Sequence, residues 1–131
     1  MGGWGQRATG ACDVAVSWAV VNVKAIRRRC LPPGQHSRFP LYRMDEDVSV
    51  MTTELDSPKS GGASCGACVA TCLVSWILRL PLVENMVGIT GELDLRGRLH
   101  PVAGMVEKAK WAMEKGVGLI IAPKANVCGG L

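Results

Sequence analysis

Residues 58–66 read Pro58-Lys59-Ser60-Gly61-Gly62-Ala63-Ser64-Cys65-Gly66, and an almost continuous apolar stretch follows them as far as Leu80. The glycines allow backbone conformations that are closed to other residues, and they let a ligand approach the chain closely. A helix that begins after such a loop directs unpaired N–H groups back toward it. The stretch therefore predicts a loop-to-helix junction that either binds an anion or presents Ser64 as a nucleophile beside oxyanion-stabilising donors.

On either side of this junction, hydrophobic periodicity predicts an α+β domain. The helix expected directly after the loop is apolar on nearly every face, which predicts a central position. The expected elements are, in chain order, a loose tail over 1–10, a helix over 13–29, a strand over 47–51, the helix over 66–80, a strand over 83–90, a strand and turn over 91–98, a helix over 104–115 capped by Gly116, a buried strand over 117–122, and an exit turn over 123–126.

A serine needs a partner that accepts its proton, and the two histidines, His36 and His100, have no convincing carboxylate partner in the sequence. Lysine is the other option, because burial favours the neutral amine that can act as a base. Lys108 lies at the edge of the apolar stripe of the helix expected over 104–115, which is formed by Met105, Ala109, Ala112 and Met113. The alternative is an ordinary lysine whose stem lies along the core while its amine reaches water.

Composition places the chain among globular proteins, with 131 residues, 48% apolar and 20% charged, enough for one domain. Residues 1–46 hold the whole net charge of +4, and their run Arg27-Arg28-Arg29 is typical of a solvated helix end rather than of a nucleic-acid site. Neither apolar run, 13–26 or 68–78, has the roughly 20 residues that a membrane span needs. We therefore expect an intracellular, soluble protein with reduced cysteines and with neither nucleic acid nor membrane as a partner.

From residue 47 to residue 126 the chain resembles the proteolytic domain of Lon proteases. Residues 58–66 are similar to the family's nucleophile motif, Pro-Lys-Asp-Gly-Pro-Ser-Ala-Gly. Residues 90–98 are similar to its Thr-Gly-Glu-Ile-Thr-Leu-Arg-Gly segment, and residues 101–108 to its Pro-Ile-Gly-Gly-Leu-Lys-Glu-Lys segment. Residues 120–126 resemble its closing strand and turn. Four motifs in the same order, at nearly the same separations, favour the nucleophile over the anion site.

The resemblance implies a ribosomal protein S5 domain 2-like fold, with short strands packed on two or three helices. It places this domain over 47–131, behind the basic segment 1–46, and without the family's final strand and helix. It also implies site roles, in which Ser64 is the nucleophile, Lys108 is the general base and Thr90 supports Lys108. The loop that helps to stabilise the oxyanion would comprise Gly61, Gly62, Ala63 and Cys65.

Lon proteases are ATP-dependent serine endopeptidases that act on unfolded or damaged proteins as hexameric rings. The resemblance therefore implies polypeptide substrates, a homo-oligomeric ring or an ATPase-bearing partner, and a place in the cytoplasm or in an organelle matrix, mitochondrial or peroxisomal. The chain contains no Gly-x-x-x-x-Gly-Lys-Ser/Thr pattern. We thus expect no cofactor within it, and ATP only through an ATPase domain outside this sequence.

The chain departs from the family pattern at three points within these motifs, and it has one further residue inserted between Pro81 and Thr90. Residues 60–63 replace Asp-Gly-Pro with one residue more, which makes the loop more flexible. Cys65 follows Ser64 and is a second candidate nucleophile, because a thiol needs less activation than a hydroxyl. Val106 replaces the first lysine of the Lys-Glu-Lys box, which leaves Lys108 as the candidate base.

Three alternatives remain open on the sequence alone. The glycine-rich loop is a loose match to the phosphate loop of small-molecule kinases of the galactokinase type. The spacing of Cys65, Cys68 and Cys72 suits one helix face and could hold zinc or an iron–sulfur cluster, with Cys12, Cys30 or Cys128 as a fourth ligand. The third alternative is an inactive remnant of a protease domain that serves as an interaction module.

Overall fold

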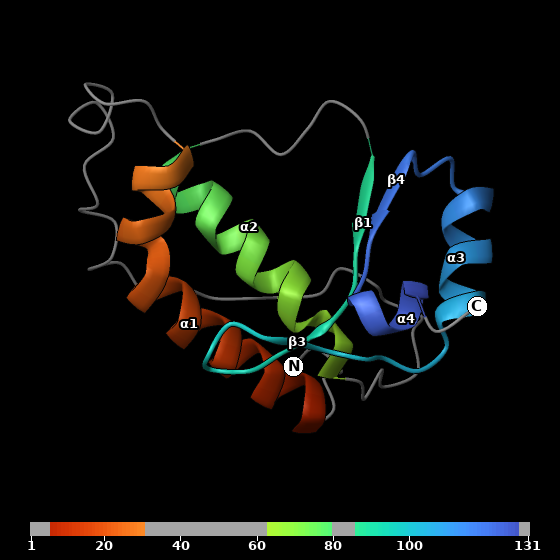
Figure 1. The fold of residues 1–131 in the computed structure, drawn as a ribbon, viewed down its shortest axis with the longest axis horizontal. Coiled ribbons are helices and arrows are strands. Elements are labelled where there is room, and N and C mark those ends of the chain that lie inside the picture. The colour runs from red at the N-terminus through yellow and green to blue at the C-terminus, as the bar shows by residue number, and fades with distance from the viewer. Residues whose placement is uncertain (1–5, 31–62, 80–85, 129–131) are drawn as a thin grey trace.

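The computed structural model describes residues 6–30, 63–79 and 86–128, which form the α+β arrangement predicted from the sequence. Figure 1 shows α1 and α2 side by side, with β1 and β4 between this pair and α3. The elements are α1 (Gln6–Cys30), η3 (Ala63–Cys65), α2 (Gly66–Leu78), β1 (Val87–Ile89), β2 (Glu92–Leu93), β3 (Leu99–His100), α3 (Met105–Glu114), β4 (Leu119–Ile121) and α4 (Lys124–Cys128). The strand expected over 47–51 lies outside the described residues. The assignment of the fold as ribosomal protein S5 domain 2-like stays a prediction.

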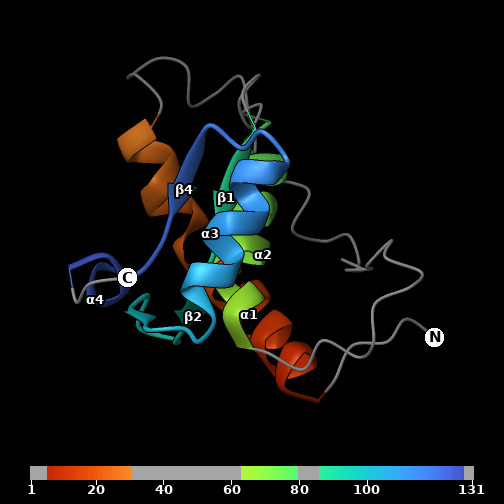
Figure 2. The same cartoon turned by 90° about the vertical axis from the view of Figure 1, so that its right-hand side faces the viewer.

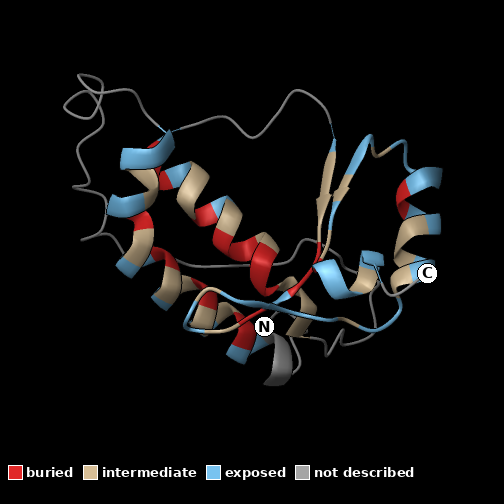
Figure 3. Cartoon of the chain, in the orientation of Figure 1, coloured by how far each residue is buried: buried red, intermediate tan, exposed pale blue. Residues whose placement is uncertain are grey.

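The main core lies between α1 and α2, and Figure 3 shows the buried residues along their facing sides. The buried row of α1 repeats at every fourth residue and consists mostly of alanines, so the two helix backbones can approach closely. Its members are Ala11, Ala15, Ala19 and Val23. Ala15 and Ala19 pack on Val69, Ala70 and Leu73 of α2, and Val23 packs on Ile77 and Leu78. The prediction of a loose tail over 1–10 is wrong from Gln6 onward, because α1 begins at Gln6 and not at Asp13.

The structure corrects the prediction that α2 is buried on nearly every face. Cys72 and Trp76 are exposed, because they point away from the side that α1 covers. The helix ends at Arg79, whose φ of 54° lies in the left-handed region and whose N–H donates to the carbonyls of Ser75 and Trp76. No helix in the described part of the chain is both long and apolar enough to cross a membrane.

Two short strand pairs connect this helix pair to α3. β1 pairs in parallel with β4, with Val87 opposite Leu119 and Ile89 opposite Ile121, and β2 pairs in antiparallel with β3. In Figure 2, α3 lies in front of β1. The prediction of a fully buried strand over 117–122 is wrong, since Leu119 and Ile121 are 55% and 44% exposed. Side chains alternate along a strand, and of the three β4 residues only Ile120 points toward α3.

The last part of the chain also differs from the prediction in two respects. The exit turn expected over 123–126 is the start of the short helix α4, which begins after the buried Pro123. Proline suits a helix start, because the missing N–H has no partner there in any case. In α3, Ala112 is buried as expected, but Met113 is 77% exposed and does not belong to the core-facing stripe.

The turn between β2 and β3 packs against α1. Asp94 Oδ1 accepts hydrogen bonds from the backbone N–H groups of Arg96 and Arg98, both at 2.9 Å, and His100 Nε2 lies 2.8 Å from Asp94 Oδ2. The bond to His100 is the main cause that lowers the pKa of Asp94. Gly97 has a φ of +82°, and a Cβ added to it would lie 2.6 Å from Trp18 Nε1. The turn therefore touches the α1 surface at a residue without a side chain.

We expect Gly97→Ala to destabilise the fold more than Gly116→Ala does. Both glycines have a positive φ, 82° and 73°, but a Cβ at Gly116 meets nothing within 4 Å. The shared backbone strain costs about 1 kcal/mol, and displacing the Trp18 indole adds about 1–2 kcal/mol for Gly97→Ala alone. Urea denaturation of the two variants measures the difference in unfolding free energy. Equal losses in the two variants would show that the turn does not rest on Trp18.

Candidate active site

The loop-to-helix junction is held against the start of β2 by backbone hydrogen bonds. Gly91 N–H donates to the Ser64 carbonyl at 3.0 Å, and Ala67 N–H donates to the Gly91 carbonyl at 3.1 Å. Gly66 is buried, and a Cβ there would lie 3.2 Å from the backbone nitrogen of Leu93. The absence of a side chain at Gly66 thus allows β2 to lie close to the first turn of α2. As a result, Ser64 has a fixed backbone position beside the residue that follows β1, Thr90.

Thr90 links the junction to α3. Among the described residues it is the one polar residue that is buried, and its N–H donates to the Ile121 carbonyl at 3.0 Å, which ties it to the end of β4. Lys108 Nζ donates to Thr90 Oγ1 at 3.4 Å, and Thr90 Oγ1 donates to the Ser64 carbonyl at 3.5 Å. Both distances are at the long end of the hydrogen-bond range. Thr90 is 18 positions from Lys108 and 26 positions from Ser64, and its hydroxyl joins these two residues.

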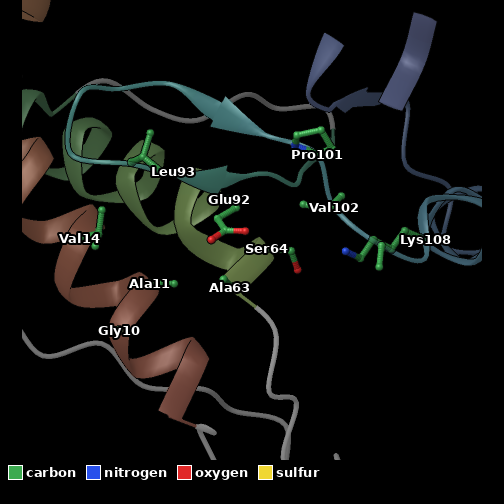
Figure 4. A pocket seen from close by; sticks show the side chains of 11 residues that line it. Gly10, Ala11, Val14, Ala63, Ser64, Glu92, Leu93, Pro101, Val102 and Lys108 are labelled. Atoms are coloured by element: carbon green, nitrogen blue, oxygen red, sulfur yellow. The ribbon is translucent and has the colours of Figure 1, made fainter. Parts of the chain in front are cut away.

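Lys108 lies in the first turn of α3, one turn after the glycine that starts it. Gly104 has a φ of 69°, which is in the left-handed region that favours glycine, and its carbonyl accepts the Lys108 N–H at 3.0 Å. This start directs the half-buried Lys108 side chain back toward Thr90. In Figure 4 the Lys108 side chain extends toward Ser64 across an open space.

Ser64 and Lys108 line two cavities. The first, of about 720 Å³, is the one in Figure 4, and its wall includes the start of α1, β2 and the loop after β3. Its lining residues are Gly10, Ala11, Val14, Ala63, Ser64, Glu92, Leu93, Pro101, Val102, Ala103 and Lys108. The second, of about 590 Å³, is mostly apolar and lies between the start of α2 and α3, with Ile89, Met105, Trp111 and Ile120 in its wall.

The structure thus brings together part of the predicted site. Ala63, Ser64 and Cys65 form η3, and Thr90 and Lys108 lie beside Ser64, whereas Gly61 and Gly62 lie outside the described residues. Sequence reasoning missed the contribution of Glu92 and of the loop over 101–103 to the first cavity. It also missed the contribution of α1, for which the small residues Gly10 and Ala11 are the only local signal. His100 lines neither cavity and pairs with Asp94 instead.

The thiols near the junction are held in their protonated form. Burial, followed by interaction with Cys12, raises the pKa of Cys65 to about 11, and burial, followed by interaction with Cys72, raises the pKa of Cys68 to about 11. A protonated thiol is a poor nucleophile at neutral pH. Across residues 6–30, 63–79 and 86–128, no group of three or more His, Cys, Asp and Glu side chains is arranged to hold a metal ion.

Comparisons with known proteins agree with the four-motif resemblance. A sequence model of the Lon protease (S16) C-terminal proteolytic domain matches residues 8–129, which include α1. The chain is 40% identical over 87 residues to a Lon protease of Brevibacillus choshinensis, a stretch that covers 66% of this chain and 11% of the relative. It is 42% identical over 87 residues to Lon protease 1 of Bacillus subtilis, with the same coverage.

A Lon protease of Fervidobacterium nodosum is 42% identical over 80 residues, which are 61% of this chain and 10% of that protein. The chain therefore spans about a tenth of the length of the curated relatives that it matches. The match of the family model covers nearly the whole chain, including all of the elements around Ser64 and Lys108. This chain belongs to the family of Lon protease C-terminal proteolytic domains.

Proposed function

We propose that this chain is a Lon-type serine endopeptidase domain that hydrolyses peptide bonds in unfolded or damaged proteins, with Ser64 as the nucleophile and Lys108 as the general base. The observation that carries the proposal is the chain of contacts from Lys108 Nζ through Thr90 Oγ1 to Ser64, at the wall of a cavity of about 720 Å³. A cavity of this size accepts a segment of an extended polypeptide. Energy to unfold and feed the substrate would come from an ATPase outside this sequence.

In the acylation half of the reaction, Ser64 Oγ attacks the carbonyl carbon of the scissile peptide bond. The serine proton passes to the amine nitrogen of Lys108, whose side chain extends toward Ser64 (Figure 4). The tetrahedral intermediate then collapses, the carbon–nitrogen bond breaks, and Lys108 returns the proton to the leaving amine. The product of this half is an ester between the substrate carbonyl and Ser64.

In the deacylation half, water attacks the ester carbonyl and Lys108 accepts its proton. The carbon–oxygen bond to Ser64 breaks, and the proton returns to Ser64 Oγ, which restores the starting state. The role of Thr90 follows from its two hydrogen bonds, since its hydroxyl accepts one hydrogen of the Lys108 amine. The Lys108 nitrogen is thereby kept near one position while it exchanges protons with the serine or the water.

The oxyanion of both intermediates requires donors near Ser64. η3 and the first turn of α2 begin with backbone N–H groups that have no partner within the helix, and one of them, the Ala67 N–H, donates to the Gly91 carbonyl. The positive end of the α2 dipole points the same way. We infer that N–H groups of the Ala63–Cys65 turn stabilise the oxyanion, a contribution worth about 3 kcal/mol per donor in other proteases.

Covalent labelling tests the identity of the nucleophile. A fluorophosphonate probe should form a phosphorus–oxygen bond with Ser64, with loss of fluoride, and mass spectrometry of the digested protein should locate the label on Ser64. The label should be absent from Ser64→Ala and retained in Cys65→Ser, because the raised pKa of Cys65 keeps that thiol protonated. A label on Cys65, or equal labelling of Ser64→Ala, would overturn the assignment. Absence of any label in the wild type would favour the inactive remnant.

A further inference from the structure

Asn126 makes an unusual pair of hydrogen bonds to a single residue of another segment. Its Oδ1 accepts the Val102 N–H at 2.9 Å, and its Nδ2 donates to the Val102 carbonyl at 2.9 Å. One side-chain amide thus engages both polar backbone groups of Val102, as a neighbouring strand does in an antiparallel pair. The two residues are 24 positions apart in the sequence, so the contact joins α4 to the loop between β3 and α3.

This loop forms a wall of the cavity that contains Ser64. Pro101, Val102 and Ala103 all line that cavity, and the loop then continues through Gly104 into the first turn of α3, which carries Lys108. Pro101 and Ala103 are exposed, so neighbouring side chains do little to hold the loop in place. Its position depends largely on the two hydrogen bonds of the half-buried Asn126. Asn126 itself is placed by the Pro123 carbonyl, which accepts the Asn126 N–H at 2.9 Å.

We propose that Asn126 is a positioning residue, which holds the 101–104 loop in the place where it supports an extended polypeptide across the cavity. This inference rests on the proposed function, since it takes the cavity to be the substrate site. The Thr90 hydroxyl links Lys108 to Ser64 independently of Asn126. Loss of the Asn126 amide should therefore weaken substrate binding more than it slows the chemical steps.

Binding can be measured without hydrolysis in the Ser64→Ala background. Fluorescence anisotropy of a short, unstructured, fluorescein-labelled peptide of Ala, Leu and Val residues would give Kd for the full chain. Addition of Asn126→Ala should raise Kd about tenfold, because the loop loses both of its tethers. Val127→Ala is the matched control, since Val127 is the next residue of α4, is 61% exposed and lines neither cavity. It should leave Kd unchanged.

Kinetics on the active protein separate positioning from chemistry. With Ser64 present, Asn126→Ala should raise KM about tenfold and change kcat by less than about threefold. Thermal melting followed by circular dichroism shows whether the variant is folded. If it is not, Asn126→Asp replaces it, because its carboxylate still accepts the Val102 N–H but cannot donate to the Val102 carbonyl. This variant should also raise Kd, because a carboxylate oxygen then faces the Val102 carbonyl oxygen in place of the lost donor.

Each outcome decides the inference. Equal Kd values for Asn126→Ala and Val127→Ala would overturn it, and so would a loss confined to kcat or a failure of the Ser64→Ala protein to bind the peptide. The proposed function fails separately. If the wild type binds the peptide with the expected dependence on Asn126 but does not cleave it, the positioning role stands and the hydrolytic role of Ser64 and Lys108 falls.

Discussion

Lys108→Ala and Ser64→Ala are each expected to lower kcat/KM for cleavage of an unstructured protein such as casein by at least about a thousandfold. Lys108→Ala removes the amine that the proposal assigns as the base, and the one histidine within the described ranges, His100, pairs with Asp94 and lines neither cavity. Without the hydroxyl of Ser64, no ester intermediate forms. Release of fluorescent fragments from labelled casein measures the loss in both variants.

Lys110→Ala is the matched control for this experiment. Lys110 is exposed on the same helix, two residues after Lys108. Lys110→Ala therefore changes the net charge and the helix as much as Lys108→Ala does, without altering either cavity. It should retain the wild-type rate. The double variant Ser64→Ala/Lys108→Ala should lose no more activity than either single variant, because the two groups act as a unit. Cleavage by Ser64→Ala or Lys108→Ala at the wild-type rate would rule out the pair.

The same experiment separates the proposed function from the alternatives. An inactive remnant would show no cleavage in the wild type and no difference among the variants. A phosphate-binding kinase-like domain would depend on the loop before α2, but it offers no account of why Lys108 from α3 is tied to Thr90 and Ser64. The convergence of the Lys108 amine, the Thr90 hydroxyl and the Ser64 carbonyl is thus the feature that the protease proposal explains and the kinase alternative does not.

Periodicity and spacing were sufficient for the elements that carry the site. The apolar stretch after Cys65 is helix α2, and the helix expected over 104–115 is α3 within one residue at each end. Both helices have strong local signals, which are a glycine at the start and a nearly continuous apolar run for α2, and glycines at both ends with an apolar repeat of three and four residues for α3. No local signal indicates that Ser64 and Lys108 lie close together. That prediction came from the resemblance of the motifs that contain them to those of the family.

The parts that could not be predicted depend on tertiary contacts. Nothing in the sequence around Asn126 indicates that its amide pairs with the backbone of Val102, because that contact requires α4 to lie beside the loop over 101–104. The exposure of Leu119 and Ile121 has the same origin, since an apolar strand can be covered on one side or on both. For α1, the alanine row could be recognised only once α2 was known to lie against it.

The second large effect concerns Thr90, whose side chain hydrogen-bonds to both residues of the proposed pair. Thr90→Val keeps nearly the same shape but removes the oxygen that accepts from Lys108 Nζ at 3.4 Å and donates to the Ser64 carbonyl at 3.5 Å. The amine would then leave its productive direction, and a displacement of about 1 Å is enough to lower kcat about a hundredfold. KM should change little, because Thr90 does not line the larger cavity.

Thr90→Ser is the conservative counterpart, because it keeps the hydroxyl and loses only a methyl group. Thr90→Ser should retain most of kcat. If Thr90 only filled space, Thr90→Ser would be the more damaging change of the two, because it leaves a small cavity whereas Thr90→Val replaces the hydroxyl with a methyl group of similar size. Steady-state kinetics on casein-derived peptides, with urea denaturation of both variants, would compare catalysis with stability. Equal kcat values for Thr90→Val and the wild type would mean that Lys108 is oriented by something other than the hydroxyl that now joins it to Ser64.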